Sequence, residues 1–200
     1  MTAQNIDEEV KALIAQDDIH QATERVIQTY GGQIFGYLQG ISRDAETAHE
    51  VFQQFSMDLW KGLGKFQWRA SLRTWLFTLA RHAHARHMRG PKGRQDAHLD
   101  THEEAALPGR WARTATELWR KTEAKDWLWE QVQSFETSDR ELLVLRLVQH
   151  MNWKEIAAVT ADSEMTGPEL TKRAASLRKR FERLKEKLRK ARDNFGTDDD

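Results

Sequence analysis

The stretch 48–82, AHEVFQQFSMDLWKGLGKFQWRASLRTWLFTLARH, contains two apolar patterns of helical period separated by a loop. The first stripe recurs at spacings of three and four, as a buried helix face requires: Ala48, Val51, Phe52, Phe55 and Leu59. The second stripe consists of Leu72, Trp75, Leu76 and Leu79. We therefore predict a helix over 44–60, a loop rich in aromatic and basic residues, and a helix that Ser71 caps and that Gly90 and Pro91 end.

Apolar residues of the same period extend to both sides of this stretch. Towards the amino terminus they predict helices over 7–29 and 34–41. Towards the carboxyl terminus periodic apolar content falls, and we expect a linker that contains Trp111 and Trp119. The predicted organisation is a helical domain over 1–92, a linker over 93–125, a second helical domain over 126–192 and an acidic tail over 193–200.

The second domain carries three helix-start signals, each a capping residue with glutamate three positions later. The pairs are Ser138 with Glu141, Asn152 with Glu155, and Thr166 with Glu169. The final helix has an apolar stripe, Leu170, Ala174, Leu177, Phe181, Leu184 and Leu188, among many lysines and arginines. Short helices before a longer basic one are typical of a helix-turn-helix DNA reader. A basic amphipathic or coiled-coil helix fits this pattern equally well.

The composition supports an all-α fold of two helical domains and excludes several functions. The 200 residues include 3 prolines and no cysteine, so disulfides and thiolate zinc sites are excluded. No apolar run approaches the roughly 18 residues of a membrane span, and no signal peptide is recognisable. We expect a cytoplasmic protein without membrane insertion, catalytic residues or cofactors. The clustered histidines His82, His84 and His87 lack a nearby acidic partner, so we expect no metal site.

The formal net charge of zero conceals two basic blocks. Residues 59–94 hold nine basic and no acidic side chains, and residues 165–192 hold eleven basic and three acidic ones. Residues 1–58 and 95–164 are acidic, with balances of −7 and −6. Because phosphate neutralisation dominates non-specific affinity for nucleic acid, two separate basic blocks favour a chain that grips DNA at two places.

Two stretches resemble the extracytoplasmic-function group of bacterial sigma factors. Residues 48–82 are similar to the second conserved region, with Leu59–Trp60, a loop from Phe66 to Arg69, and then Thr74–Trp75–Leu76. Residues 132–159, with the sequence EIA at 155–157, are similar to the fourth region, and SLRKRFERLKEKLR at 176–189 resembles its final basic helix. Departures are His82, where the family commonly has asparagine, and a longer segment between EIA and the basic helix.

The resemblance implies a transcription initiation factor that binds core RNA polymerase and promoter DNA, with an anti-sigma factor as a candidate third partner. It implies two helical domains that recognise two promoter elements and help to melt the duplex. The acidic helix would bind polymerase through Asp44, Glu46, Glu50, Gln53 and Asp58. The downstream element and melting would involve Phe66, Gln67, Trp68, Arg69, Arg73, Arg81, His82 and Arg86. The upstream element would be read by Arg173, Arg178, Lys179, Arg180 and Arg183.

Some of the aromatic residues have a simpler structural interpretation. Trp60, Trp75 and Leu76 are expected in the core, whereas Trp68 is as suited to a DNA or partner contact as to packing. The alternative function is a helix-turn-helix regulator that binds its operator without polymerase, as a dimer on a palindrome. An enzyme is not supported, since no glycine-rich phosphate loop and no apolar site with paired carboxylates is present.

Overall fold

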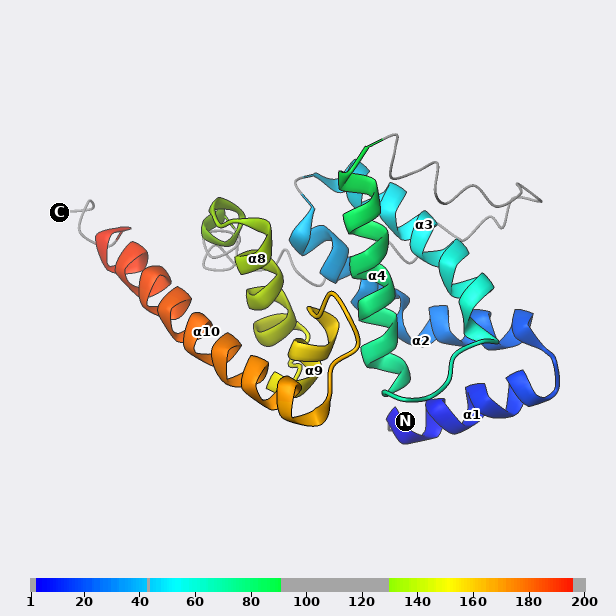
Figure 1. Ribbon diagram of the computed structural model, residues 1–200. Coiled ribbons are helices and arrows are strands. Elements are labelled where there is room, and N and C mark those ends of the chain that lie inside the picture. Colours follow the sequence, from blue (N-terminus) through cyan, green and yellow to red (C-terminus); the bar gives the residue numbers. More distant parts are fainter. Residues whose placement is uncertain (1–2, 43, 91–129, 196–200) are drawn as a thin grey trace. The chain divides into compact units, whose positions relative to one another are not determined.

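A computed structural model describes residues 3–42, 44–90 and 130–195 (Figure 1). The chain separates into two compact units, Met1–Thr116 and Glu117–Asp200. The first unit contains α1 (Ala3–Ala15), α2 (Ile19–Ile41), α3 (Ala45–Leu63) and α4 (Leu72–Met88). The second contains α8 (Thr137–Leu143), a π-helical turn η1 (Val144–Val148), α9 (Trp153–Val159) and α10 (Gly167–Phe195).

In the first unit α2 is the central helix, and it differs from the two helices predicted over 7–29 and 34–41. The first helix stops at Ala15, and Asp18 starts the next one by accepting a hydrogen bond from the backbone N–H of Gln21 at 2.9 Å. That helix then runs through Gly31 without interruption. A glycine costs about 1 kcal/mol in a helix interior, but burial of Ile34 and Leu38 favours the continuous helix.

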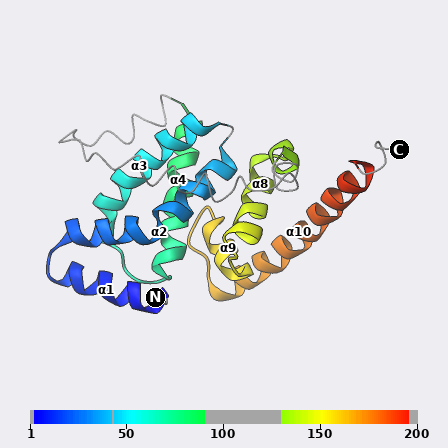
Figure 2. The ribbon, with the colours of Figure 1, turned by 180° about the vertical axis from the view of Figure 1, so that it is seen from behind.

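Helices α3 and α4 pack against α2 and against each other and complete the core of the first unit (Figures 1 and 2). Fully buried aromatic rings meet there, with Tyr37 edge-on to Phe77 at 5.2 Å between ring centroids. The predicted cap of α4 is confirmed, since Ser71 Oγ accepts from the Thr74 backbone N–H at 3.2 Å. The chain leaves α4 at Gly90, whose φ of +75° favours glycine.

In the second unit, two of the three predicted capping pairs form. Asn152 and Glu155 make a complete capping box at α9. The Glu169 carboxylate accepts from the Thr166 backbone N–H at 2.8 Å. The Ser138 signal is wrong, because α8 begins one residue earlier at Thr137 and has no side-chain cap. The hydroxyl of Ser138 accepts a hydrogen bond from Arg180 instead.

The prediction of an all-α fold with two helical domains is confirmed, since every regular element in the described ranges is helical. The unit boundary at residues 116 and 117 falls inside the segment predicted as a linker. That segment, with Trp111 and Trp119, lies outside the described residues. Helix α10 continues to Phe195, past the predicted start of the acidic tail. None of the described helices is long and apolar enough to cross a membrane.

Candidate nucleic-acid interface

In the first unit, the segment between α3 and α4 holds a stacked aromatic cluster, formed by Phe66, Trp68 and Trp75. The rings of Phe66 and Trp75 stack with centroids 4.6 Å apart, and Trp68 tilts against Phe66 at 4.8 Å. Gly62 allows this arrangement, because a Cβ there would approach the Trp75 ring within 3.3 Å. All three side chains stay partly exposed, so the cluster offers aromatic surface that is already ordered.

The polar members of the same segment, Gln67 and Arg69, are exposed. Trp68 between them has a φ of +57°, in the left-handed region that a tryptophan rarely occupies. This backbone turn sends the ring back onto Phe66 while its neighbours stay in solvent. The four predicted residues Phe66 to Arg69 therefore lie together. The rings of Phe66 and Trp68 are in contact, and the amide of Gln67 and the guanidinium of Arg69 are exposed next to them.

The predicted residues of α4 are spread along the helix. From Arg73 to Arg86 the helix rises about 20 Å, so they do not form one compact site. Arg73 contacts Gln33 at 3.3 Å and lies over the Phe77 ring. Arg81 and His82 follow further along, the first half-buried and the second exposed.

Arg86, predicted to hold DNA, forms an ion pair with Asp58, which was predicted to bind polymerase. The side chains are 27% and 19% exposed, so the pair ties α4 to α3. The predicted roles of Asp58 in polymerase binding and of Arg86 in DNA binding stay predictions, and the ion pair is the contact that the structure gives both side chains. On α3, position 58 lies about 120° around the helix from Glu46, at 100° per residue, and Asp58 faces α4.

The other predicted polymerase residues present one exposed face of α3. Glu46, Glu50 and Gln53 are exposed at spacings of four and three, and Glu50 approaches His87 Nδ1 at 3.7 Å. Asp44 lies at the start of the helix, where it accepts hydrogen bonds from the backbone and side chain of Thr47. These bonds hold the pKa of Asp44 below its ordinary value of 3.8. The acid is thus ionised and part of the helix cap.

The same face continues into two exposed apolar residues. Met57 is 50% exposed and Trp60 is 47% exposed. The prediction of Trp60 as a core residue is wrong: its indole meets only the edge of His20 among the ring contacts described. Helical spacing carries the signal that was missed, since positions 57 and 60 follow Glu50 and Gln53 by seven residues each. Trp75 and Leu76 agree better with prediction, half-buried and fully buried respectively.

In the second unit, α9 and α10 form a helix-turn-helix with a connection over 160–166. The apolar stripe of α10 packs inward, with Phe181 edge-on to Trp153 of α9 at 5.4 Å. Ala174, Leu184 and Leu188 are buried on the same side. The predicted apolar face of this helix is therefore part of the core of its own unit.

Two of the five predicted upstream-element residues also face inward. Arg173 donates to the backbone carbonyl and hydroxyl of Thr160, which fixes the connection to α9. Arg180 donates to Asp139 and to Ser138 at 2.5 and 2.7 Å, which fixes α10 to α8. In the structure these two arginines connect helices within the second unit, and their predicted contact with the upstream element stays a prediction.

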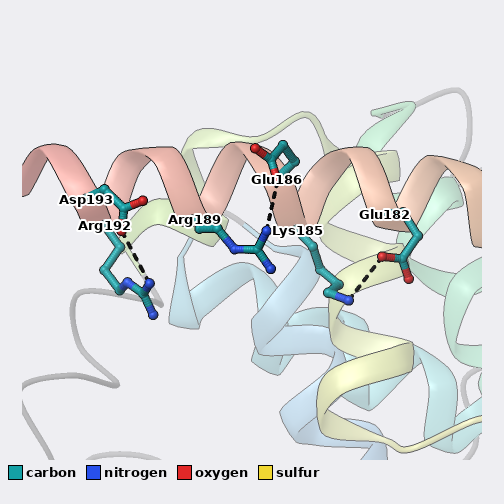
Figure 3. Close-up of polar contacts among 6 residues, drawn as sticks. All are labelled: Glu182, Lys185, Glu186, Arg189, Arg192 and Asp193. Atoms are coloured by element: carbon teal, nitrogen blue, oxygen red, sulfur yellow. Dashed lines mark hydrogen bonds and ion pairs between the residues drawn. The ribbon is translucent and has the colours of Figure 1, made fainter.

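Exposed cations form a basic stripe along α10, consisting of Lys172, Lys179, Arg183, Lys187 and Lys190. Within the described part of the chain none of them makes an ion pair. The adjacent face is different: Glu182 pairs with Lys185 at 3.0 Å and Glu186 with Arg189 at 3.1 Å (Figure 3). One side of the helix therefore neutralises itself, while the other presents unpaired positive charge.

Replacing Arg180 by alanine is expected to loosen α8 from α10, because the substitution leaves Asp139 without its cation. Loss of a hydrogen bond to a charged group costs about 1.5–3 kcal/mol, and the partial exposure of Arg180 places the effect at the lower end. Hydrogen exchange of the full chain measures it, as faster exchange over 137–148. Arg178→Ala, at an exposed position of the same helix, is the matched control. Equal exchange in the two variants would contradict the structural role of Arg180.

Comparison with known proteins adds family information to this geometry. Residues 26–94 match the family model for sigma-70 region 2. The match begins within α2 at Val26 and includes α3, the aromatic cluster and α4. The chain is 25% identical over 170 residues to the RNA polymerase sigma factor YlaC of Bacillus subtilis (strain 168), covering 85% of this chain and 94% of YlaC.

A solved structure shares the fold. It is the sigma factor RpoE from Bartonella quintana, in a co-crystal structure with the anti-sigma factor NepR. The match has a TM-score of 0.53 at 17% identity and covers 82% of this chain and 96% of the other. In the described residues no three histidine, aspartate or glutamate side chains gather in a way that could hold a metal ion.

Proposed function

Because this chain is a sigma factor of the extracytoplasmic-function group, we propose that it binds core RNA polymerase, recognises two promoter elements and promotes melting of the DNA. The observation that carries the proposal is the arrangement within residues 26–94, where an ordered aromatic cluster adjoins a helix bearing arginines and histidines. Sigma factors direct transcription initiation without covalent chemistry of their own, and action on RNA polymerase would place this one in the bacterial cytoplasm.

The exposed face of α3 is the surface we assign to polymerase. Its first half offers the carboxylates of Glu46 and Glu50, and its second half offers the apolar side chains of Met57 and Trp60. A buried apolar anchor beside charged groups is a common composition of protein interfaces. The partner surface would be basic at one end and apolar at the other. Asp58 would support this face from below through its ion pair with Arg86.

The aromatic cluster is the surface we assign to the melted downstream element. Unstacked bases bind by stacking on aromatic rings, at about 1–3 kcal/mol per base, and by hydrogen bonds to their edges. Trp68 supplies a ring, and Gln67 and Arg69 supply exposed polar groups beside it. Arg81 and His82 extend the same helix surface toward the DNA backbone. Arg73 would bind the downstream element while its guanidinium keeps its contact with Gln33.

We assign the upstream element to α10, which would enter the major groove as the second helix of the helix-turn-helix. Arg173 and Arg180 would fix α10 to the helices beside it. The residues that contact DNA would be the exposed Lys172, Arg178, Lys179 and Arg183. Lys172 lies one turn into the helix, where such motifs meet base edges. The paired cations Lys185 and Arg189 would contribute less, since their charge is already compensated.

We propose an anti-sigma factor as a further partner. The structural neighbour from Bartonella quintana was crystallised with such a protein. An inhibitor of this kind would compete with polymerase for the exposed face of α3, because the apolar pair Met57 and Trp60 is the largest exposed apolar feature described on that helix. Competition between the two proteins for this face would make binding mutually exclusive.

Run-off transcription tests the proposed function. Purified bacterial core polymerase is combined with the protein and a library of upstream regions from its host. Discrete transcripts that disappear without the protein are expected, and their start sites define the two promoter elements. If the protein alone retains specific DNA and yields no transcripts with polymerase, the proposal is wrong and a polymerase-independent regulator is the better description.

A further inference from the structure

Helix α1 lies outside the matched family region, which begins at residue 26. It is nevertheless part of the folded unit, since Ile6 and Val10 are 2% and 0% exposed. An ion pair of 2.7 Å between Glu9 and Arg25 also joins it to α2. The helix therefore has a fixed position beside the segment that leads into α4 (Figure 1).

Two side chains of α1 reach that segment. Burial raises the pKa of the Asp7 carboxyl, and the nearby backbone N–H of Leu72, the first residue of α4, opposes this rise. One turn later, the ammonium of Lys11 lies over the ring of Trp68 at 4.7 Å from its centroid. From α2, Ile19 contacts the segment at Gly64, where a Cβ would approach Ile19 Cδ1 within 3.1 Å. The aromatic segment is thus held from outside at its start, its middle and its end.

The contact between Lys11 and Trp68 lies at a residue with an unfavourable backbone conformation, the left-handed region. A non-glycine residue at a φ of +57° persists only where surrounding contacts stabilise it. Among the aromatic and cation–π contacts of the described residues, Trp68 meets the Phe66 ring and the Lys11 ammonium. Removal of Lys11 would take away the contact that comes from α1, and the tryptophan would sample other conformations more often.

We propose that α1 is a brace for the promoter-facing segment, in which Lys11 is a positioning residue that keeps Trp68 ready for the first unstacked base. This proposal rests on the proposed function for its consequence in transcription, although the brace itself is a property of the free protein. A ring held in place before melting loses little conformational freedom when a base arrives, which favours capture. Lys11 acts through Trp68 and touches no base.

The first experiment measures the brace in the full-length protein without DNA. Acrylamide quenching is recorded for the protein and for its Trp68→Phe variant, and the difference reports on Trp68 alone. Lys11→Ala is expected to increase quenching of Trp68, and Lys11→Arg is expected to restore protection. Glu24→Ala is the matched control, because Glu24 is exposed on α2 and accepts a hydrogen bond from Gln28 of the same helix. Unchanged quenching in Lys11→Ala would overturn the brace.

The second experiment measures the rate of open-complex formation by holoenzyme on a duplex promoter. An exposed cation–π contact corresponds to about a two- to fivefold change in an equilibrium, so Lys11→Ala is expected to slow the rate by about this factor. The same promoter with a premelted bubble should show a smaller effect, and in a Trp68→Ala background Lys11→Ala should have none.

The two experiments separate the possible failures. Increased quenching with an unchanged rate would overturn the positioning role, because the brace would then have no consequence for melting. An equal effect of Lys11→Ala with and without Trp68 would also overturn it, since Lys11 would then act on DNA directly. If the wild-type holoenzyme fails to transcribe at all, the proposed function fails, and quenching still decides whether the brace exists.

Discussion

Replacing Lys172, Lys179 and Arg183 together by alanine is expected to cause the largest loss of DNA affinity available from α10. Each phosphate neutralised contributes about 0.9 to the slope of log binding constant against log salt, so losing three contacts lowers the slope by about 2.7. Between 50 and 200 mM salt the wild-type affinity should then fall about 40-fold further than that of the variant. Titration of holoenzyme on labelled promoter DNA at several salt concentrations measures this slope.

A triple variant of the adjacent face is the matched control. Lys185, Arg189 and Arg192 lie on the same helix, and each pairs with a neighbouring carboxylate in the structure (Figure 3). Their replacement by alanine removes the same formal charge. These paired cations displace fewer counterions from DNA than unpaired ones, so less of the salt dependence is lost with them. We expect a clearly smaller change of slope. Equal slopes in the two variants would show that net charge, and not the basic stripe, determines the affinity.

Replacing Phe55 by alanine is expected to destabilise the first unit severely, by about 3–5 kcal/mol. Phe55 is 1% exposed and packs against the ring of Phe52, so truncation leaves a cavity in the core. Trp60 lies five residues later on the same helix and is 47% exposed. Trp60→Ala should therefore change the free energy of unfolding far less, within about 1 kcal/mol.

Chemical denaturation of both variants, followed by circular dichroism, tests the assignment of Trp60. The same Trp60→Ala variant should weaken binding to core polymerase, because the indole is the apolar anchor of the face proposed for that partner. A large loss of stability with unchanged polymerase binding would contradict the assignment and return Trp60 to the core. Met57→Ala provides a second, smaller truncation on the same exposed face.

The site residues separate into groups that the sequence could not distinguish. Charge and spacing alone made Arg173, Arg178, Lys179, Arg180 and Arg183 equivalent candidates for DNA. The fold assigns Arg173 to Thr160 and Arg180 to Asp139, which leaves the other three exposed. Long guanidinium side chains reach across helix interfaces, so their partners depend on which helices are adjacent, and that adjacency is not encoded in local sequence.

Local patterns were sufficient for the helical character of the chain and for some of the helix starts, although not for the boundary between α1 and α2 or for the start of α8. The three- and four-residue spacing of apolar side chains determined that the chain is helical, and Ser71 and Asn152 determined where two helices begin. These signals are local, because an amphipathic face and a cap depend on residues within one or two turns. The motif at 48–82, read without any knowledge of packing, lies within the residues that match the sigma-70 region 2 model.

Tertiary structure decided which side of each helix is used. It turned Asp58 and Arg86 toward each other, exposed Trp60 and brought Lys11 over Trp68 from a helix more than fifty residues away. It also carried α2 through Gly31, where local propensity favoured a break. For α2, burial against other helices outweighs a local preference of about 1 kcal/mol. In every case the deciding factor is which helices are adjacent, and that adjacency appears only in the fold.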